Sequence, residues 1–351
     1  MTNTLEDNTT SDPTAMLRLL DLASVLKPMA LRVAATLNIA DLLAEGPKTV
    51  TELAEATSTS ELHLRKLLSY LAEMDIFVET ESGQFENTSL SEPLLSTSPL
   101  SIRRILDVNG GVGRSQLGLV GLLHTITTGE TCHASVFGSR YWDDLNNDPK
   151  YLESLRSDGN RGPVYGAEEI IHGYDWSGVG TVIDIGGNNG MVLINLLQAH
   201  AYLTGATLDL PNLASIAGDE IAAAGLSERA ESIAGSFFEP LPQGYDVYLL
   251  SGILNDWTDS EAVEILTNVA AAAGPRAKIL LGEINLRYEM MTPNVAELDL
   301  YMSTLVPAPV RTLEDISRIA APAKLKAELV RDDHPFRTLI ELVPVTAGSA
   351  S

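Results

Sequence analysis

From residue 181 to near the end of the chain, short apolar segments alternate with segments of helical pattern. The strand-like segments are residues 181–185, 206–210, 230–234, 246–251, 278–284, 326–331 and 338–345. Strands that alternate with helices assemble into a parallel sheet, because each helix carries the chain back to the start of the next strand. Only a short loop separates the last two segments, so we expect an antiparallel pair at one edge. The pattern predicts an α/β domain with a mostly parallel seven-stranded sheet whose last strand is antiparallel.

The first part of the chain follows a different, mostly helical pattern. Residues 49–53 are typical of a capped helix start, and a second helix is expected to begin within residues 60–68. Residues 76–80 and 84–88 flank a short Glu-Ser-Gly turn, which predicts a β-hairpin. Two helices followed by a hairpin predict a winged helix.

A winged helix can bind DNA through its second helix, where Arg65 and Lys66 are the obvious positive charges. The whole chain, however, has 23 Lys and Arg against 47 Asp and Glu, a formal charge of -24. Such a charge repels phosphate backbones and anionic membrane surfaces. We therefore expect no nucleic-acid or membrane partner, and we favour a core or subunit-facing role for Leu64 and its helical neighbours. A DNA-binding regulator is the less favoured alternative.

The composition of the remaining segments suggests how the chain is divided. The first fifteen residues are polar and acidic, without the basic start and apolar centre of a signal peptide. No apolar run reaches the roughly 20 residues needed to cross a bilayer. The one cysteine, Cys132, suits a reducing compartment, so we expect a cytoplasmic protein. The predicted parts are a disordered tail (1–15), a winged-helix domain (16–110), a helical bridge contributing to a substrate pocket (111–172), the α/β domain (173–346) and a short tail (347–351).

A glycine-rich turn follows the first predicted strand and precedes an apolar helix. Its glycines allow the backbone to approach a ligand closely, although a tight turn without a ligand is the alternative. Asp209 ends the next strand about 20 residues further on, where an acid can accept hydrogen bonds from ribose hydroxyls. The two features fit a nucleoside-containing cofactor, and a nicotinamide dinucleotide is one alternative. No spacing of His, Asp or Glu typical of a metal site occurs.

Four segments in sequence order resemble one enzyme family. Residues 184–190, 208–211, 235–238 and 254–259 are similar to the class I S-adenosylmethionine-dependent O-methyltransferases that act on plant phenolics and bacterial aromatic polyketides. Residues 174–177 resemble the anthracycline-tailoring members, which include a hydroxylase. The resemblance implies a Rossmann-like domain that binds S-adenosylmethionine, preceded by a winged-helix dimerisation domain, and hence a homodimer that acts on a small molecule.

The resemblance also implies roles for individual residues. Asp209 would bind the ribose, Ser236 and Phe237 the adenine, and Asn255 and Glu283 would be the catalytic positions next to the substrate. The turn residues would shape the methionine and ribose end of the cofactor, and we assign the end of strand 246–251 to the same site. These further cofactor residues are Asp184, Gly186, Gly187, Gly190 and Ser251.

Several positions depart from the family pattern. Asn188 replaces a glycine, Ser236 replaces an aspartate, and Asn255 stands where most members have the histidine that removes the phenol proton. An amide can orient a hydroxyl but has no pKa that would let it act as a base. We interpret the neighbouring Asp256 and Asp259 as helix caps.

The sequence therefore predicts an O-methyltransferase that modifies a hydroxyl of an aromatic or polyketide-like natural product. The alternative is a repurposed enzyme on the same fold that performs hydroxylation, decarboxylation, cyclisation or a rearrangement.

Overall fold

The computed structural model describes residues 13–155, 167–284, 294–307, 311–333 and 337–345. The chain divides into two compact units, Met1–Val108 and Asn109–Ser351, which are considered one at a time. The predicted bridge and the predicted sheet both belong to the second unit.

The first unit contains the two helices and the hairpin that the sequence predicts. Its elements are α1 (Pro13–Leu22), α2 (Leu26–Thr36), α3 (Ile39–Leu43), β1 (Lys48–Thr49), α4 (Val50–Thr57), α5 (Glu61–Ala72), β2 (Phe77–Glu79), β3 (Gln84–Asn87), η1 (Glu92–Leu94) and α6 (Arg103–Leu106). The strands form a small antiparallel sheet in the order β1-β3-β2. Thr49 and Glu52 form the capping box that starts α4. Leu53, Leu68 and Phe85 lie fully inside the core.

The start of this unit differs from the sequence-based expectation. Helix α1 begins at Pro13, inside the segment expected to be a disordered tail, and none of its residues is buried within the chain. Pro28 lies in the first turn of α2. A proline is tolerated in the first turn because the N–H that it lacks has no helical partner there.

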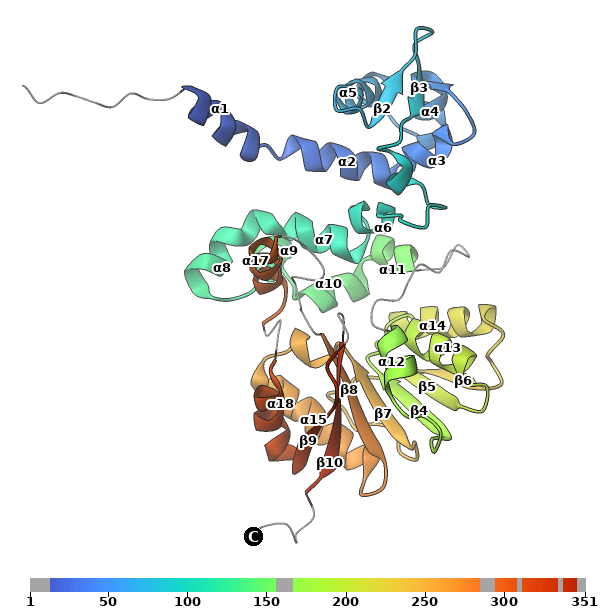
Figure 1. Cartoon of the computed structure of the whole chain (residues 1–351), viewed down its shortest axis with the longest axis vertical. Helices are drawn as coiled ribbons and strands as arrows, with labels where there is room; N and C mark the ends of the chain where they lie inside the picture. The colour runs from blue at the N-terminus through green and yellow to red at the C-terminus, as the bar shows by residue number, and fades with distance from the viewer. Residues whose placement is uncertain (1–12, 156–166, 285–293, 308–310, 334–336, 346–351) are drawn as a thin grey trace, which may run out of the picture. The chain divides into compact units, whose positions relative to one another are not determined.

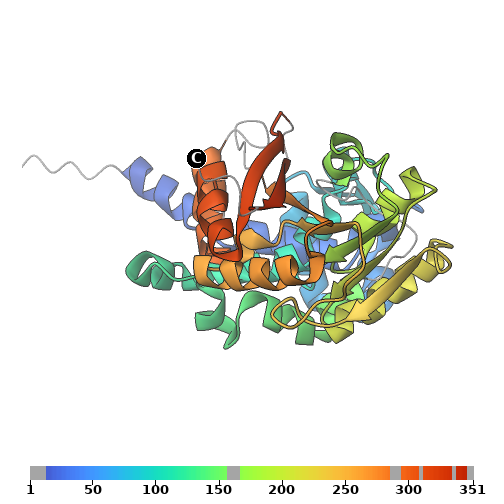
Figure 2. The same cartoon turned by 90° about the horizontal axis from the view of Figure 1, so that it is seen from below.

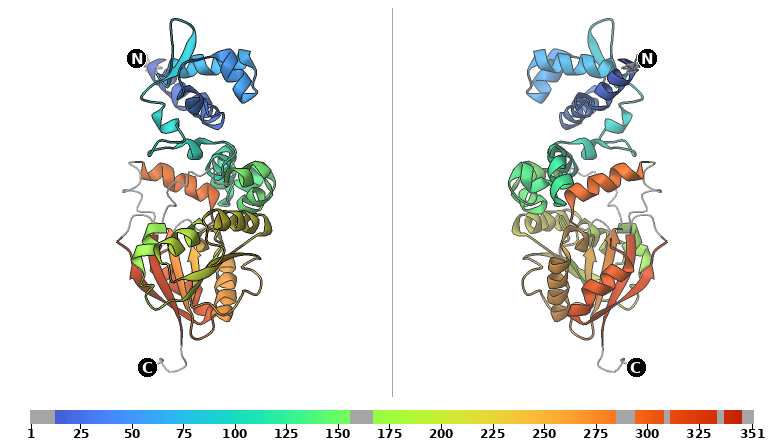
Figure 3. Two further views of the ribbon diagram at one scale, coloured as in Figure 1. Left: turned by 90° about the vertical axis from the view of Figure 1, so that its right-hand side faces the viewer. Right: turned by 90° about the vertical axis from the view of Figure 1, so that its left-hand side faces the viewer.

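The second unit begins with short helices that form the predicted bridge. They are α7 (Gly111–Leu117), η2 (Gly118–Gly121), α8 (Leu122–Thr128), α9 (His133–Phe137), α10 (Tyr141–Asn147), α11 (Pro149–Leu155) and α12 (Ala167–Gly173). A late helix, α17 (Val295–Leu305), lies beside α7, α8 and α9 in Figures 1 and 3. The Cys132 N–H donates to the Thr304 carbonyl at 3.0 Å, and the Ser115 hydroxyl is hydrogen-bonded to the Tyr301 hydroxyl. The chain thus returns from the sheet to complete the bridge.

The sheet of the second unit has seven strands in the order β6-β5-β4-β7-β8-β10-β9. The strands are β4 (Thr181–Ile185), β5 (Thr204–Asp209), β6 (Ala230–Ala234), β7 (Val247–Ser251), β8 (Lys278–Ile284), β9 (Leu325–Arg331) and β10 (Arg337–Pro344). Strand β10 runs antiparallel to both of its neighbours, β8 and β9, and the first five strands are parallel to one another. The predicted sheet is confirmed, including the antiparallel last strand.

Helices cover both faces of this sheet (Figure 2). On one face α12, α13 (Met191–Ala199) and α14 (Pro211–Ala223) pack against side chains such as Val182 and Leu249. On the other face α15 (Asp259–Ala273) and α18 (Leu313–Ala320) pack against Ile183 and Tyr248. Short 3-10 helices, η3 (Leu254–Asp256) and η4 (Ala321–Ala323), precede α15 and follow α18. The carboxyl ends of β4, β5 and β7 meet at one edge, which is where parallel α/β sheets bind ligands.

Candidate active site

The turn between β4 and α13 adopts a backbone shape that few residues can take. Gly186, Asn188 and Gly190 have φ angles of 74°, 53° and 77°, all in the left-handed region. Asparagine is one of the non-glycine residues that enter this region most readily. The replacement of glycine by Asn188 is therefore accommodated. The Asn188 N–H donates to Asp209 Oδ2 at 2.7 Å, so the turn is also tied to the end of β5.

Gly187 occupies a position with no room for a side chain. A Cβ there would lie 2.2 Å from Thr207 Oγ1 and 2.7 Å from Asp184 Oδ2. Thr207 and Asp184 belong to the adjacent strands β5 and β4 and are buried, so neither can move away freely. The glycine lets the turn pack directly onto the sheet.

Replacing Gly187 with alanine should destabilise the protein by about 1–3 kcal/mol, the usual effect of forcing a methyl group into a packed interior. Urea unfolding of both proteins measures the change. Gly178→Ala is a matched control, because a Cβ at Gly178 has no atom within 4 Å. Equal stability of the two variants would contradict the tight packing of this turn.

A cleft of about 310 Å³ lies beside the turn, at the carboxyl ends of the strands. This volume is at the lower end of the range for small-molecule sites, roughly 300–1,000 Å³. Among the predicted cofactor residues, five line the cleft and three do not. The five are Gly186, Asp209, Ser236, Phe237 and Ser251, and the three are Asp184, Gly187 and Gly190. We call this space the cofactor cleft.

Two acids lie next to the turn, Asp184 on β4 and Asp209 at the end of β5. Asp184 is 1% exposed, and within the described part of the chain neither of its carboxylate oxygens has a hydrogen-bond partner. Burial, together with the nearby charge of Asp209, raises the pKa of Asp184 to about 7. Burial also raises the pKa of Asp209, although the N–H groups of Leu210 and Asn188 oppose that rise. A pair of acids in such surroundings fits a ligand that brings hydroxyl groups and positive charge.

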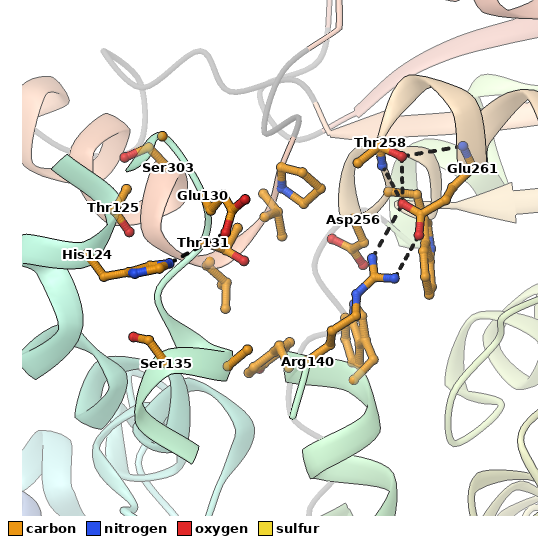
Figure 4. Close-up of a pocket in the computed structure, with 18 of the residues that line it drawn as sticks. His124, Thr125, Glu130, Thr131, Ser135, Arg140, Asp256, Thr258, Glu261 and Ser303 are labelled. Carbon is orange, nitrogen blue, oxygen red and sulfur yellow. Dashed lines mark hydrogen bonds and ion pairs between the residues drawn. The ribbon is translucent and has the colours of Figure 1, made fainter. Parts of the chain in front are cut away.

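A second, larger cavity of about 1140 Å³ adjoins the cofactor cleft. Its walls come from α8, α9 and α10 of the bridge, from the segment that starts α15, and from the end of α17 (Figure 4). Arg140 pairs with Glu261 at 2.7 Å and stacks 4.7 Å above the Trp257 ring. Trp142, Asp143, Asp256 and Trp257 line both spaces, so the two share a wall. We call the larger space the bridge cavity.

The two predicted catalytic residues lie behind these walls. Asn255 and Glu283 are each 3% exposed, and neither lines the cofactor cleft or the bridge cavity. The Asn255 Nδ2 group donates to Asp256 Oδ1 at 2.8 Å. Burial raises the pKa of Glu283 to about 7, while the charges of Arg311 and Arg337 oppose the rise. Glu283 pairs with Thr338 within the sheet, so it is neither a helix cap nor a surface carboxylate.

The interpretation of Asp256 and Asp259 as helix caps is wrong. Thr258 caps α15 through a capping box with Glu261, whose side chain accepts from the Thr258 N–H at 2.9 Å. Asp259 pairs with Arg311 at 3.0 Å and also with Arg318. Asp256 is thereby left on the wall shared by the two spaces, with a pKa raised to about 7. Asp256 was not identified from the sequence as a site residue. Its position directly after Asn255, which replaces the family's histidine, was the feature that could have indicated it.

Two family models match this chain. The model of the O-methyltransferase domain matches residues 121–325, and the model of the O-methyltransferase dimerisation domain matches residues 9–97. The chain belongs to the O-methyltransferase family. The predicted family, fold and enzyme class are therefore confirmed, and the repurposed enzyme is not favoured.

Among the curated relatives of this O-methyltransferase is the 2,7-dihydroxy-5-methyl-1-naphthoate 7-O-methyltransferase of Streptomyces carzinostaticus. It is 37% identical over 326 residues, which cover 93% of this chain and 96% of the relative. The aclacinomycin 10-hydroxylase RdmB of Streptomyces purpurascens is 33% identical over 312 residues, 87% of this chain and 83% of that protein. The family thus includes a protein named for a different reaction.

A solved structure of an O-methyltransferase from neocarzinostatin biosynthesis, NcsB1, has the same fold. It superposes with a TM-score of 0.77 at 36% identity and covers 93% of this chain and 98% of its own. That structure contains S-adenosylmethionine and 2-hydroxy-5-methyl naphthoic acid. In the described part of this O-methyltransferase, no helix has both the length and the apolar character needed to cross a membrane.

Proposed function

We propose that this protein transfers the methyl group of S-adenosylmethionine to a hydroxyl of an aromatic natural product. The observation that carries the proposal is a cofactor cleft, built on a left-handed glycine turn and Asp209, that shares a wall with the bridge cavity. A methyl donor in the cleft and an acceptor in the cavity would meet at the wall that the two spaces share.

The cofactor cleft has groups suited to each part of S-adenosylmethionine. Asp209 would accept hydrogen bonds from the ribose hydroxyls, and Phe237 would lie against the adenine, with Ser236 next to it. Ser236 Oγ accepts from the Phe238 N–H at 3.2 Å, which orients the hydroxyl in place of the family's aspartate. The unpartnered carboxyl of Asp184 favours a positive charge nearby. When bound, the cofactor supplies an electrophilic methyl group on a sulfonium.

The bridge cavity suits an aromatic acceptor. The side chains of Tyr141, Trp142 and Trp257 contribute flat apolar surfaces to its lining. Its volume of about 1140 Å³ is several times that of the cofactor cleft, so it admits a substrate of more than one ring. The 2,7-dihydroxy-5-methyl-1-naphthoate named for the Streptomyces carzinostaticus relative is a two-ring compound of this kind with a free 7-hydroxyl, and it is the natural first probe.

The protein is expected to act as a homodimer. The dimerisation model covers residues 9–97, which lie in the first unit. Helix α1 supports this, because it exposes large apolar side chains that a second copy would cover. These side chains are Met16, Leu17, Leu19, Leu20 and Leu22. Light scattering should therefore give twice the mass of one chain.

Isothermal titration calorimetry with S-adenosylmethionine, and separately with S-adenosylhomocysteine, tests the cofactor. Mass spectrometry after incubation with S-adenosylmethionine and 2,7-dihydroxy-5-methyl-1-naphthoate tests the reaction, and we expect the acceptor to gain one methyl group. Absence of binding by both cofactor forms would overturn the proposed function. Binding without methylation of this probe or of other hydroxylated naphthalenes would favour the repurposed alternative.

A further inference from the structure

We propose that Asp256 is the general base of methyl transfer in this chain and that Asn255 holds its carboxylate in position. The proposal rests on the proposed function. It states that the proton of the acceptor hydroxyl is taken up by Asp256, the residue that follows the position of the family's histidine. Asp256 ends η3, directly after the loop that follows β7.

The location of Asp256 is where a base is needed. It lines the cofactor cleft and the bridge cavity, together with Trp142, Asp143 and Trp257. Figure 4 shows its side chain on the wall of the bridge cavity, between Arg140 and the start of α15. An acceptor hydroxyl that reached the methyl donor through this junction would pass within reach of the carboxylate.

The neighbouring residue orients the Asp256 carboxylate. The Asn255 amide donates to Oδ1 at 2.8 Å, and the Trp142 side chain, on the same wall, lowers the pKa of this carboxyl. An amide cannot take up a proton, but its N–H group can orient an acid that does. The exchange of histidine for asparagine at position 255 therefore leaves a base at the site and moves it by one residue. Asn255 acts as a positioning residue.

The surroundings of Asp256 adjust its proton affinity to a useful value. Burial raises its pKa to about 7, against the lowering effect of the Trp142 side chain. The charges that face it come from Glu283 on β8, which raises the pKa, and from Arg337 on β10, which lowers it. Tyr141 on α10 also faces Asp256, and burial raises the pKa of this tyrosine well above its usual value, so it stays neutral. A base is most effective when its pKa is close to the operating pH.

The other acids on the wall of the bridge cavity are less suitable. Glu261 accepts two hydrogen bonds from Arg140 and also caps α15, and its pKa is lowered. Glu130 is exposed and lies 3.7 Å from His124. Asp143 is exposed on α10. Among the described acids that line this cavity, Asp256 combines enclosure with fixed orientation.

The step balances in atoms and charge. The acceptor oxygen forms a bond to the methyl carbon as the carbon–sulfur bond of the sulfonium donor breaks, and the hydroxyl proton passes to an Asp256 oxygen. The products are a methyl ether, a neutral thioether and a neutral carboxylic acid, which later returns its proton to water. One positive and one negative charge disappear together, which is favourable in a site of low dielectric constant.

The assignment is tested by the pH profile of kcat, measured with S-adenosylmethionine and an acceptor that the wild-type protein methylates. Wild type should show a rising limb near neutral pH, and Asp256→Asn should lose this limb and about 10²–10⁴-fold in kcat. Asp299→Asn is the matched control: it removes an exposed carboxylate on α17 that lines neither the cofactor cleft nor the bridge cavity, and it should keep the limb. Asp256→Glu, which retains a carboxylate, should also keep it. A rising limb that persists in Asp256→Asn, with kcat within tenfold of wild type, overturns the proposal.

Two further measurements keep the test independent of any one variant. Asn255→Ala removes a donor to the ionised carboxylate, so the rising limb should move to higher pH, and an unmoved limb counts against the positioning role. Infrared difference spectra of the cofactor-free protein should show a protonated carboxyl band that disappears near pH 7 in wild type. That band should be weaker in Asp256→Asn. If wild type binds no cofactor or methylates nothing, the proposed function fails; if wild type is active and these signatures are absent, only this assignment fails.

Discussion

Replacing Asp209 with alanine should lower the affinity for S-adenosylmethionine by about 10²–10⁴-fold. Hydrogen bonds to charged groups contribute about 1.5–3 kcal/mol each, and two from the ribose hydroxyls correspond to this factor. The same carboxylate accepts from the N–H groups of Asn188 and Leu210, both at 2.7 Å, so its loss also releases the glycine turn. Isothermal titration calorimetry gives the dissociation constants directly.

A matched variant separates this effect from a general loss of charge. Asp299→Ala removes an exposed carboxylate on α17 that lines neither the cofactor cleft nor the bridge cavity. Its affinity for the cofactor should equal that of wild type. A loss of less than tenfold in Asp209→Ala would show that the ribose is bound elsewhere.

Replacing Asp184 with asparagine should remove a large pH dependence from the stability of the cofactor-free protein. The pKa of Asp184 is about 7 in the folded chain, against an ordinary value of 3.8, so the folded state binds more protons between these limits. The stabilisation from this group is complete below about pH 4 and is lost as pH rises to about 7. About three pKa units correspond to about 4 kcal/mol. Urea unfolding at a series of pH values should show a smaller decline in the variant by this amount.

A second aspartate provides a control of opposite sign. Asp246 accepts from the N–H groups of Gly180 and Thr181, both at 2.9 Å, which lowers its pKa. The stabilisation from Asp246 is present above its unfolded pKa and is lost as pH falls through its folded pKa. In Asp246→Asn, the free energy of unfolding should therefore decline less as pH falls on the acid side. Unchanged profiles in Asp184→Asn would mean that this carboxyl is hydrated in solution.

Local sequence was sufficient to predict the sheet and the glycine turn that follows its first strand. Strands such as 181–185 and 278–284 are short apolar runs between helical segments, and their order along the chain restricts how a sheet can form. The turn at 186–190 depends on residues that accept left-handed backbone, a property of glycine and asparagine themselves. Asp209 follows at the spacing that the fold requires.

The side chains around the bridge cavity could not be predicted in the same way. Thr258 rather than Asp256 caps α15, and this choice depends on a turn of the chain that the sequence leaves open. Helix α17 completes the bridge through contacts with residues more than 150 positions away, Ser115 and Cys132. Pairings at such separations leave no periodic signal in the sequence.

The sequence alone therefore determined the family, the positions of the strands along the chain and the glycine turn, because these depend on residue type and short spacing. Only the tertiary structure decided that Asn255 lies behind the wall while Asp256 lies on it. It also decided that Asp184, Asp256 and Glu283 have pKa values near 7. The physical reason is that the proton affinity of a carboxyl depends on burial and on charges brought close by folding, and neither is a property of the residue itself.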